Sequence, residues 1–260
     1  MADSNDSRRK YFVHSAHRTI GVSAGWAALQ ACDLSGFVHH EERPRPIRVG
    51  LLCGALAYFS DGRILALRRH LEAHGRVTCE PVFGGPADDP TGMEDLDACD
   101  CLVLIAELAK IDQRQLRRVR EHCRRGGAVI GVRTAGHGSP QWPEMETEIF
   151  GGDYRGDCAN DSTEVEIVQS AGSHPVLAGV EPFVSPGSLQ KNPRIVADAT
   201  LLLTGGCPGH VQPVAWTRLN RGSRVFYTSL GHEGDFRQTS FLRLLANAVS
   251  WACEVSGLGE

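Results

Sequence analysis

The chain from Ile47 to Cys253 is predicted to form one α/β domain built on a mostly parallel, doubly wound sheet. Two observations support this prediction. The run Cys101 to Ala106 is apolar throughout, which is typical of a strand that is buried on both faces, as in parallel sheets. Segments of strand length and helix length also alternate along the first half of the domain, and parallel strands need such crossover helices.

The first crossover unit begins with a strand at Ile47 to Cys53. Leucines and an isoleucine at helical spacing follow from Asp61 to His74, and Gly75 ends that helix before a second strand at Val77 to Phe83. The strand at Cys101 to Ala106 opens the next unit, so the alternation of elements continues.

A second amphipathic helix is predicted from Asp112, a suitable cap, to Arg125. Gly126 and Gly127 close it before the strand Ala128 to Arg133. Beyond Gly151 the pattern predicts a half-exposed strand around Val165, a strand at 200–204, a hairpin that pairs 214–219 with 224–230, and a closing helix at 236–252.

Composition limits the possible function. The 260 residues carry a formal net charge of -4 without a continuous basic surface, so nucleic acid is not an expected partner. Nine scattered cysteines are expected to be mostly reduced and buried. No run approaches the roughly 20 apolar residues that span a bilayer, so no transmembrane segment is expected.

Residues 1–46 are predicted to form a separate N-terminal arm that ends in the linker Glu41 to Pro46. Arg8 and Arg9 precede apolar residues, an order that resembles a twin-arginine export signal and would place the protein in the periplasm or cell envelope. Cys32 could then be a lipidated residue. The alternative is a disordered or loosely docked arm on a cytoplasmic protein.

Candidate functional residues follow the predicted strands, because ligands of open parallel sheets bind beyond the carboxyl ends of the strands. The spacing Gly131-Val132-Arg133-Thr134-Ala135-Gly136 is that of a nucleophile elbow, whose turn lifts one side chain toward the cleft. A guanidinium stays protonated and cannot attack a carbonyl, but it can bind an anion or an oxyanion. Covalent acyl transfer is therefore disfavoured, and a structural salt bridge is the alternative role for Arg133.

Several blocks resemble the ThuA family, named for trehalose utilisation. They are Ile47 to Gly50, Gly151 to Gly156, His174 to Gly179, Pro213 to Trp216 and Arg224 to His232. The resemblance covers nearly all of 47–253 and implies a flavodoxin-like, three-layer domain related to class I glutamine amidotransferases, without the glutaminase cysteine. It implies a role in the catabolism of trehalose or other disaccharides through 3-keto sugars. The sequence departs from the family pattern at Asp157, where histidine is common, and at Gly187-Ser188-Leu189, where an acidic and an aromatic residue are usual.

These residues predict acid–base chemistry on a sugar carbonyl, without a cysteine nucleophile. The predicted catalytic residues are His232, Arg133 and Glu107, with Arg133 stabilising an enediolate oxygen. The predicted substrate-binding residues are Asp153, Tyr154, Thr134, His137 and Glu233. No metal site is predicted from spacing, and neither a cofactor nor an oligomeric state can be assigned from the sequence.

Three alternatives remain open. His232 could simply cap the last helix, and the domain could bind or scaffold a carbohydrate without catalysis. A true glutaminase is disfavoured because Cys123 belongs to a helix and Cys158 follows the elbow.

Overall fold

The computed structural model describes residues 45–53, 61–73, 75–83, 94–105, 113–137 and 140–254. All of them belong to the second of the two units into which the chain divides, Arg45–Glu260. The predicted export signal and Glu107 lie outside the described residues, as do the ends of the strand and helix predicted around residues 106–112. No helix in the described part of the chain has the length and hydropathy to cross a membrane.

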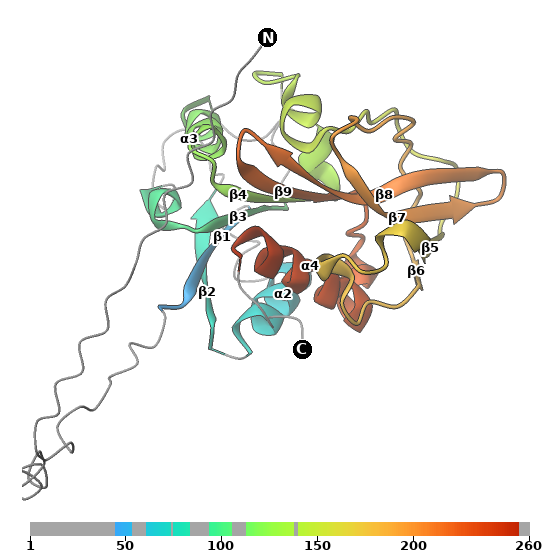
Figure 1. Cartoon of the computed structure of the whole chain (residues 1–260), viewed down its shortest axis with the longest axis horizontal. Coiled ribbons are helices and arrows are strands. Elements are labelled where there is room, and N and C mark those ends of the chain that lie inside the picture. The colour runs from blue at the N-terminus through green and yellow to red at the C-terminus, as the bar shows by residue number, and fades with distance from the viewer. Residues whose placement is uncertain are drawn as a thin grey trace, which may run out of the picture. The chain divides into compact units, whose positions relative to one another are not determined.

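One half of the sheet is parallel. It has the order β2 (Val77–Phe83), β1 (Ile47–Cys53), β3 (Cys101–Leu104), β4 (Ala128–Val132) and β9 (Ser223–Thr228), and each adjacent pair in it is parallel. This order is that of flavodoxin-like sheets, with β9 as the fifth strand. The crossover units predicted from the sequence therefore form this half, as Figure 1 shows.

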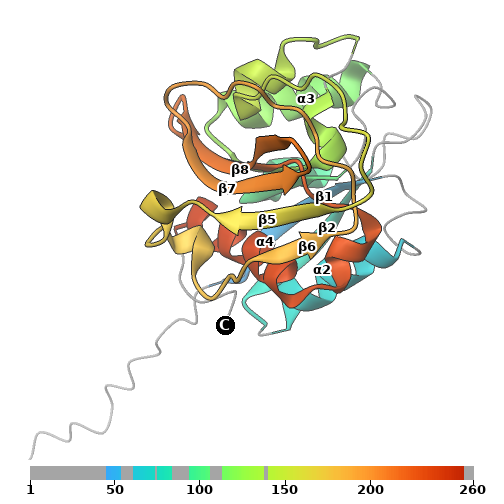
Figure 2. The ribbon, with the colours of Figure 1, turned by 90° about the vertical axis from the view of Figure 1, so that its right-hand side faces the viewer.

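The other half of the sheet is antiparallel, so the prediction of a mostly parallel sheet is wrong. From β9 outward the order is β8 (His210–Asn220), β7 (Thr200–Cys207), β5 (Thr163–Ile167) and β6 (Phe183–Ser185), with every adjacent pair antiparallel (Figure 2). The physical reason is the length of the connections. Arg221 and Gly222 alone join β8 to β9, and so short a turn cannot make a parallel crossover.

Helices cover both faces of the sheet. α2 (Gly62–Glu72) and α4 (Thr239–Ala252) lie on one face, while α3 (Gln113–Arg124) lies on the other (Figure 1). Asp61 begins α2 as predicted, because its Oδ1 accepts the N–H of Arg63 at 2.8 Å. α4 begins later than predicted, because a short 3-10 helix at Glu233–Arg237 precedes it.

Two hydrophobic cores separate these layers, because alternate strand residues point to opposite faces. Leu51 and Ile130 belong to the core beneath α2 and α4, whereas Leu52 belongs to the core beneath α3. Trp216 is fully buried in the second core, and its Nε1 donates to the carbonyl of Phe150 at 2.7 Å. This bond ties a π-helix at Glu146–Phe150, which the sequence did not predict, to the centre of the sheet.

Candidate functional site

The turn after β4 has the geometry of a nucleophile elbow, with an arginine in the nucleophile's place. Arg133 has φ of +48°, a left-handed conformation that side-chain-bearing residues rarely adopt. The hydroxyl of Tyr227 donates to its carbonyl at 2.8 Å and holds the turn. A Cβ at Gly131 would lie 2.4 Å from Phe150 Cε1, so the close packing behind the turn requires glycine there.

The guanidinium of Arg133 is half-buried and contacts neutral oxygen atoms. Its Nη1 donates to the carbonyl of Ser229 at 3.2 Å, and its Nη2 donates to Ser188 Oγ at 3.3 Å. Neither contact involves a carboxylate, and a guanidinium has more donors than these two bonds use. The site therefore presents a cation whose remaining donors suit a carbonyl oxygen or an oxyanion.

His232 caps the 3-10 helix that precedes α4 and remains exposed. Its Nδ1 accepts the N–H of Gly234 at 3.2 Å, while Asp235 Oδ2 accepts the N–H groups of Gly231 and His232 at 2.8 Å. The capping alternative is thus what the structure shows. It also fixes a chemical property: when Nδ1 accepts, the proton of the neutral ring is on Nε2, which can then donate to a ligand.

Gly187 lies between Arg133 and His232. A Cβ built on Gly187 would lie 2.9 Å from His232 Cβ and 3.5 Å from Arg133 Nη1. Thr163 Oγ1 donates to the carbonyl of Gly187 at 2.8 Å and anchors this segment to β5. Arg133 and His232 follow the adjacent parallel strands β4 and β9, and the antiparallel half of the sheet supplies the glycine that lies beside both.

The two departures from the family pattern contact each other. Ser188 Oγ donates to Asp157 Oδ2 at 3.2 Å, and the hydroxyl of Tyr154 donates to Asp157 Oδ1 at 3.2 Å. Because Ser188 also accepts from Arg133, a continuous polar chain joins Arg133 to Tyr154. Asp157 is exposed, so its carboxylate is open to a ligand at this end of the sheet.

A second polar group adjoins Tyr154. The rings of His137 and Tyr154 stack with centroids 4.1 Å apart, and His137 Nε2 lies 3.0 Å from the Gln190 side-chain amide nitrogen. Gln190 is 2% exposed, yet its Oε1 has no hydrogen-bond partner among the described residues, and neither side-chain amide atom of buried Asn192 has one. Buried amides without partners are uncommon, and a hydroxyl-rich ligand or water would satisfy them.

Sequence reasoning missed Glu146, a half-buried carboxyl group beside this group of residues. Its Oε1 accepts the backbone N–H of Tyr154 at 2.7 Å, and burial raises its pKa from 4.5 to about 7. It lies on the π-helix, a local distortion frequently found at functional sites. The sequence around it gives no signal, because Glu144 and Glu148 flank it at equal spacing.

Replacing Glu146 with glutamine is expected to stabilise the fold at pH 8 and not at pH 4. Below pH 4.5 the carboxyl is protonated in both the folded and the unfolded chain. As the pH rises toward 7, the Glu146 carboxyl ionises first in the unfolded chain. The free energy of unfolding of the wild-type protein therefore falls by about 1–2 kcal/mol, once solvent screening is allowed for. Glutamine keeps the acceptor for Tyr154 and does not ionise. Urea unfolding at both pH values measures the difference, and an equal effect at pH 4 would contradict this explanation.

Of the other predicted site residues, one lies next to Arg133 and two form ion pairs with arginines. Thr134 is half-buried within the turn after β4, close in sequence to Arg133. Asp153 instead forms ion pairs with Arg155 at 2.6 Å and with Arg194 at 3.1 Å. Glu233 forms an exposed ion pair with Arg237 at 2.7 Å. Across the described residues, no group of three or more His, Cys, Asp or Glu side chains could hold a metal ion.

Comparison with known proteins agrees with this fold. The family model described as ThuA, trehalose utilisation, matches residues 66–252. A solved structure of a protein described as ThuA-like, from Bacteroides uniformis, has a TM-score of 0.60 at 17% identity and covers 80% of this chain and 92% of its own. A second protein described as ThuA-like, from Parabacteroides merdae, has a TM-score of 0.59 at 18% identity. The match covers 80% of this chain and 90% of that one. The structure of PurLQS from Thermotoga maritima has a TM-score of 0.50 at 11% identity. The match covers 79% of this chain and 99% of that one. No curated protein matches the chain in sequence.

Proposed function

This chain belongs to the ThuA family, described as trehalose utilisation, and from that premise we propose that it acts on a carbohydrate by acid–base chemistry without a cysteine nucleophile. The substrate class is trehalose or another disaccharide, in particular a 3-keto derivative. One observation carries the proposal: Arg133 and His232, on separate strand ends, flank the same glycine, Gly187. Two adjacent hydrogen-bond donors suit a sugar carbonyl, whose oxygen gains negative charge when a neighbouring proton is removed.

The roles follow from the hydrogen bonds. Arg133 would stabilise the developing oxyanion, and His232 would donate a hydrogen bond to it through Nε2–H. The base would then be a carboxylate. Asp157 is suited to this role, because it is exposed and joined to Arg133 through Ser188.

Nuclear magnetic resonance of sugars incubated with the purified protein tests the proposal. We expect the 3-keto derivative of trehalose to be converted, with exchange of the proton beside the carbonyl in deuterated water as the earliest sign of acid–base chemistry. Glutamine serves as a control, because a glutaminase would release ammonia. No change in any sugar and no exchange would overturn the catalytic assignment.

A noncatalytic carbohydrate-binding domain is the second candidate. It is favoured by the use of His232 Nδ1 as a helix cap, since a purely structural histidine would look the same. Calorimetry distinguishes the two, because sugar binding without exchange or turnover would support the binding domain alone.

A further inference from the structure

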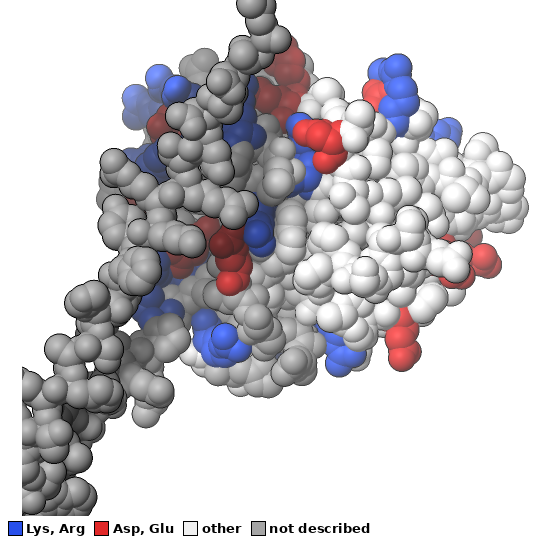
Figure 3. Space-filling view, viewed as in Figure 1, with Lys and Arg blue, Asp and Glu red and all other residues white. Residues whose placement is uncertain are grey.

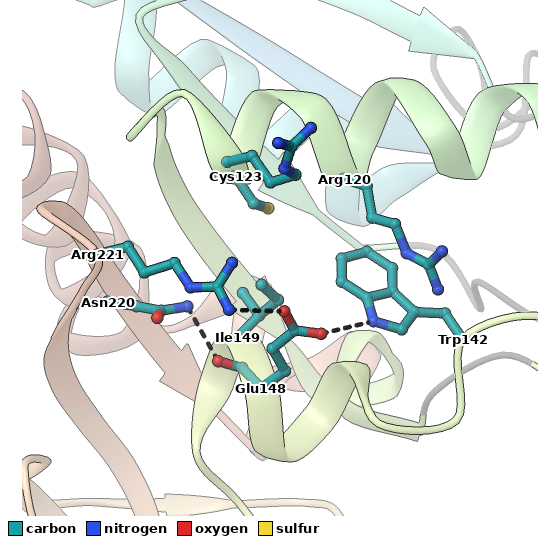
Figure 4. A pocket seen from close by; sticks show the side chains of 8 residues that line it. Arg120, Cys123, Trp142, Glu148, Ile149, Asn220 and Arg221 are labelled. Atoms are coloured by element: carbon teal, nitrogen blue, oxygen red, sulfur yellow. Dashed lines mark hydrogen bonds and ion pairs between the residues drawn. The ribbon is translucent and has the colours of Figure 1, made fainter.

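A hollow lies at the opposite end of the strands from the candidate site. It is lined by the end of α3, by the π-helix at Glu146–Phe150 and by the β8–β9 turn, and has a volume of about 340 Å³, open space at its mouth included (Figure 4). The turn at Arg221 directly precedes β9, whereas Ser229 beside Arg133 follows it. The hollow therefore lies at the amino end of β9, whereas the candidate site lies at its carboxyl end.

Positive charge dominates this hollow. Three guanidinium groups line it, from Arg120, Arg124 and Arg221, against the single carboxylate of Glu148. Arg120 and Arg124 are four residues apart on α3 and so lie on the same side of that helix. Arg221 enters from the hairpin turn with its guanidinium directed toward Glu148, while Arg120 lies over the Trp142 ring (Figure 4). An anion held between the two elements would meet donors from both walls.

The wider surface also favours anions at this place. Between Gln113 and Arg124 the sequence of α3 has five arginines and one glutamate, while the whole chain has a net charge of -4. Basic side chains gather around α3 in Figure 3. Arg118 on this helix pairs instead with Asp97 and does not line the hollow. The local excess of positive charge raises the concentration of anions near the hollow.

Internal contacts hold the walls in position. The Arg120 guanidinium lies 4.5 Å from the centroid of the Trp142 ring, and Trp142 Nε1 donates to Glu148 Oε2 at 3.0 Å. Glu148 Oε1 is 3.6 Å from Arg221 Nη2, too far for a hydrogen bond. Glu148 is therefore held by the indole and forms only a longer ion pair with Arg221, whose guanidinium makes no hydrogen bond to it.

The backbone at Arg221 is strained. Its φ is +52°, a left-handed conformation in which asparagine or glycine is more stable than arginine. The fold therefore places a guanidinium where the turn by itself would favour a smaller residue, and strain of this kind is often found at functional positions.

We propose that this hollow binds a phosphate group, either free or as the monoester of a small organic molecule. Arginine forks match the oxygen atoms of phosphate, and the lining keeps an excess of positive charge although Arg124 also pairs with Glu121 at 2.9 Å. Cys123 and Ile149 add an apolar lining that suits the organic part of a monoester. A long polymer is not expected, since the charge converges on an enclosed hollow.

Titration calorimetry of the full chain, with inorganic phosphate and with phenyl phosphate at constant ionic strength, tests this site. Arg221→Asn is the sharpest variant, because asparagine fits the turn and folding is preserved. We expect it to weaken binding of either probe about tenfold or more. Arg118→Gln also removes one positive charge, from an α3 side chain that does not line the hollow, and is expected to change binding less than about twofold.

The indole N–H resonance of Trp142, identified by its loss in Trp142→Phe, should shift as phosphate is added. Tighter binding of phenyl phosphate would identify an organic monoester as the ligand, and equal binding would identify free phosphate. Absence of binding at about 10 mM phosphate, or equal weakening by Arg221→Asn and Arg118→Gln, would overturn the proposal.

Discussion

Replacing His232 with alanine is expected to lower kcat/KM for the sugar substrate about a hundredfold to a thousandfold, the usual contribution of one hydrogen-bond donor to an oxyanion. The loss should appear mainly in kcat, because the Nε2 proton matters most when charge develops on the substrate. The helix cap is lost at the same time, and this costs about 1 kcal/mol of stability. Turnover and urea unfolding should be measured on the same preparation.

His174→Ala is the matched control. His174 Nδ1 accepts the N–H of Val176 at 3.2 Å and caps the 3-10 helix at Pro175–Leu177, the same contact that His232 makes with Gly234. Its removal should cost similar stability and leave turnover unchanged. If both variants lost activity equally, helix capping would explain the effect and the catalytic role of His232 would be wrong.

Replacing Arg133 with glycine is expected to lower kcat about a hundredfold to a thousandfold while the fold remains intact. The loss follows from removal of the donor to the developing oxyanion. Glycine adopts φ of +48° without strain, so the backbone gain of about 1 kcal/mol offsets the two lost side-chain hydrogen bonds. Thermal unfolding and kcat together separate the two effects.

Arg243→Gln provides the comparison for Arg133. Arg243 Nη1 also donates to a backbone carbonyl, that of Gly179 at 2.7 Å, but it belongs to α4 and not to the strand ends that form the site. Normal kcat is expected for this variant. Normal kcat in Arg133→Gly as well would show that the guanidinium only braces Ser188 and Ser229.

Local patterns were enough for most of the regular elements, though not for β6 or for the π-helix at Glu146–Phe150. Apolar spacing indicated the bounds of the strand at 47–53, and a capping residue indicated the start of the helix after Asp61. The turn residues indicated the hairpin around Arg221. The glycine spacing around Arg133 also gave the elbow, since the room behind such a turn is a local requirement. These features depend on residues that are near one another in the chain.

The partners of the site required the tertiary structure. Gly187 and Ser188 reach Arg133 only because β5 and β6 add antiparallel strands beyond β7, a pairing between distant segments that no local period encodes. Glu146 differs from Glu144 and Glu148 only in its burial, which raises its pKa. The sequence by itself determined which side chain the elbow carries. Only the packing of remote strands decided what that side chain meets, because hydrogen bonding and desolvation depend on neighbours in space.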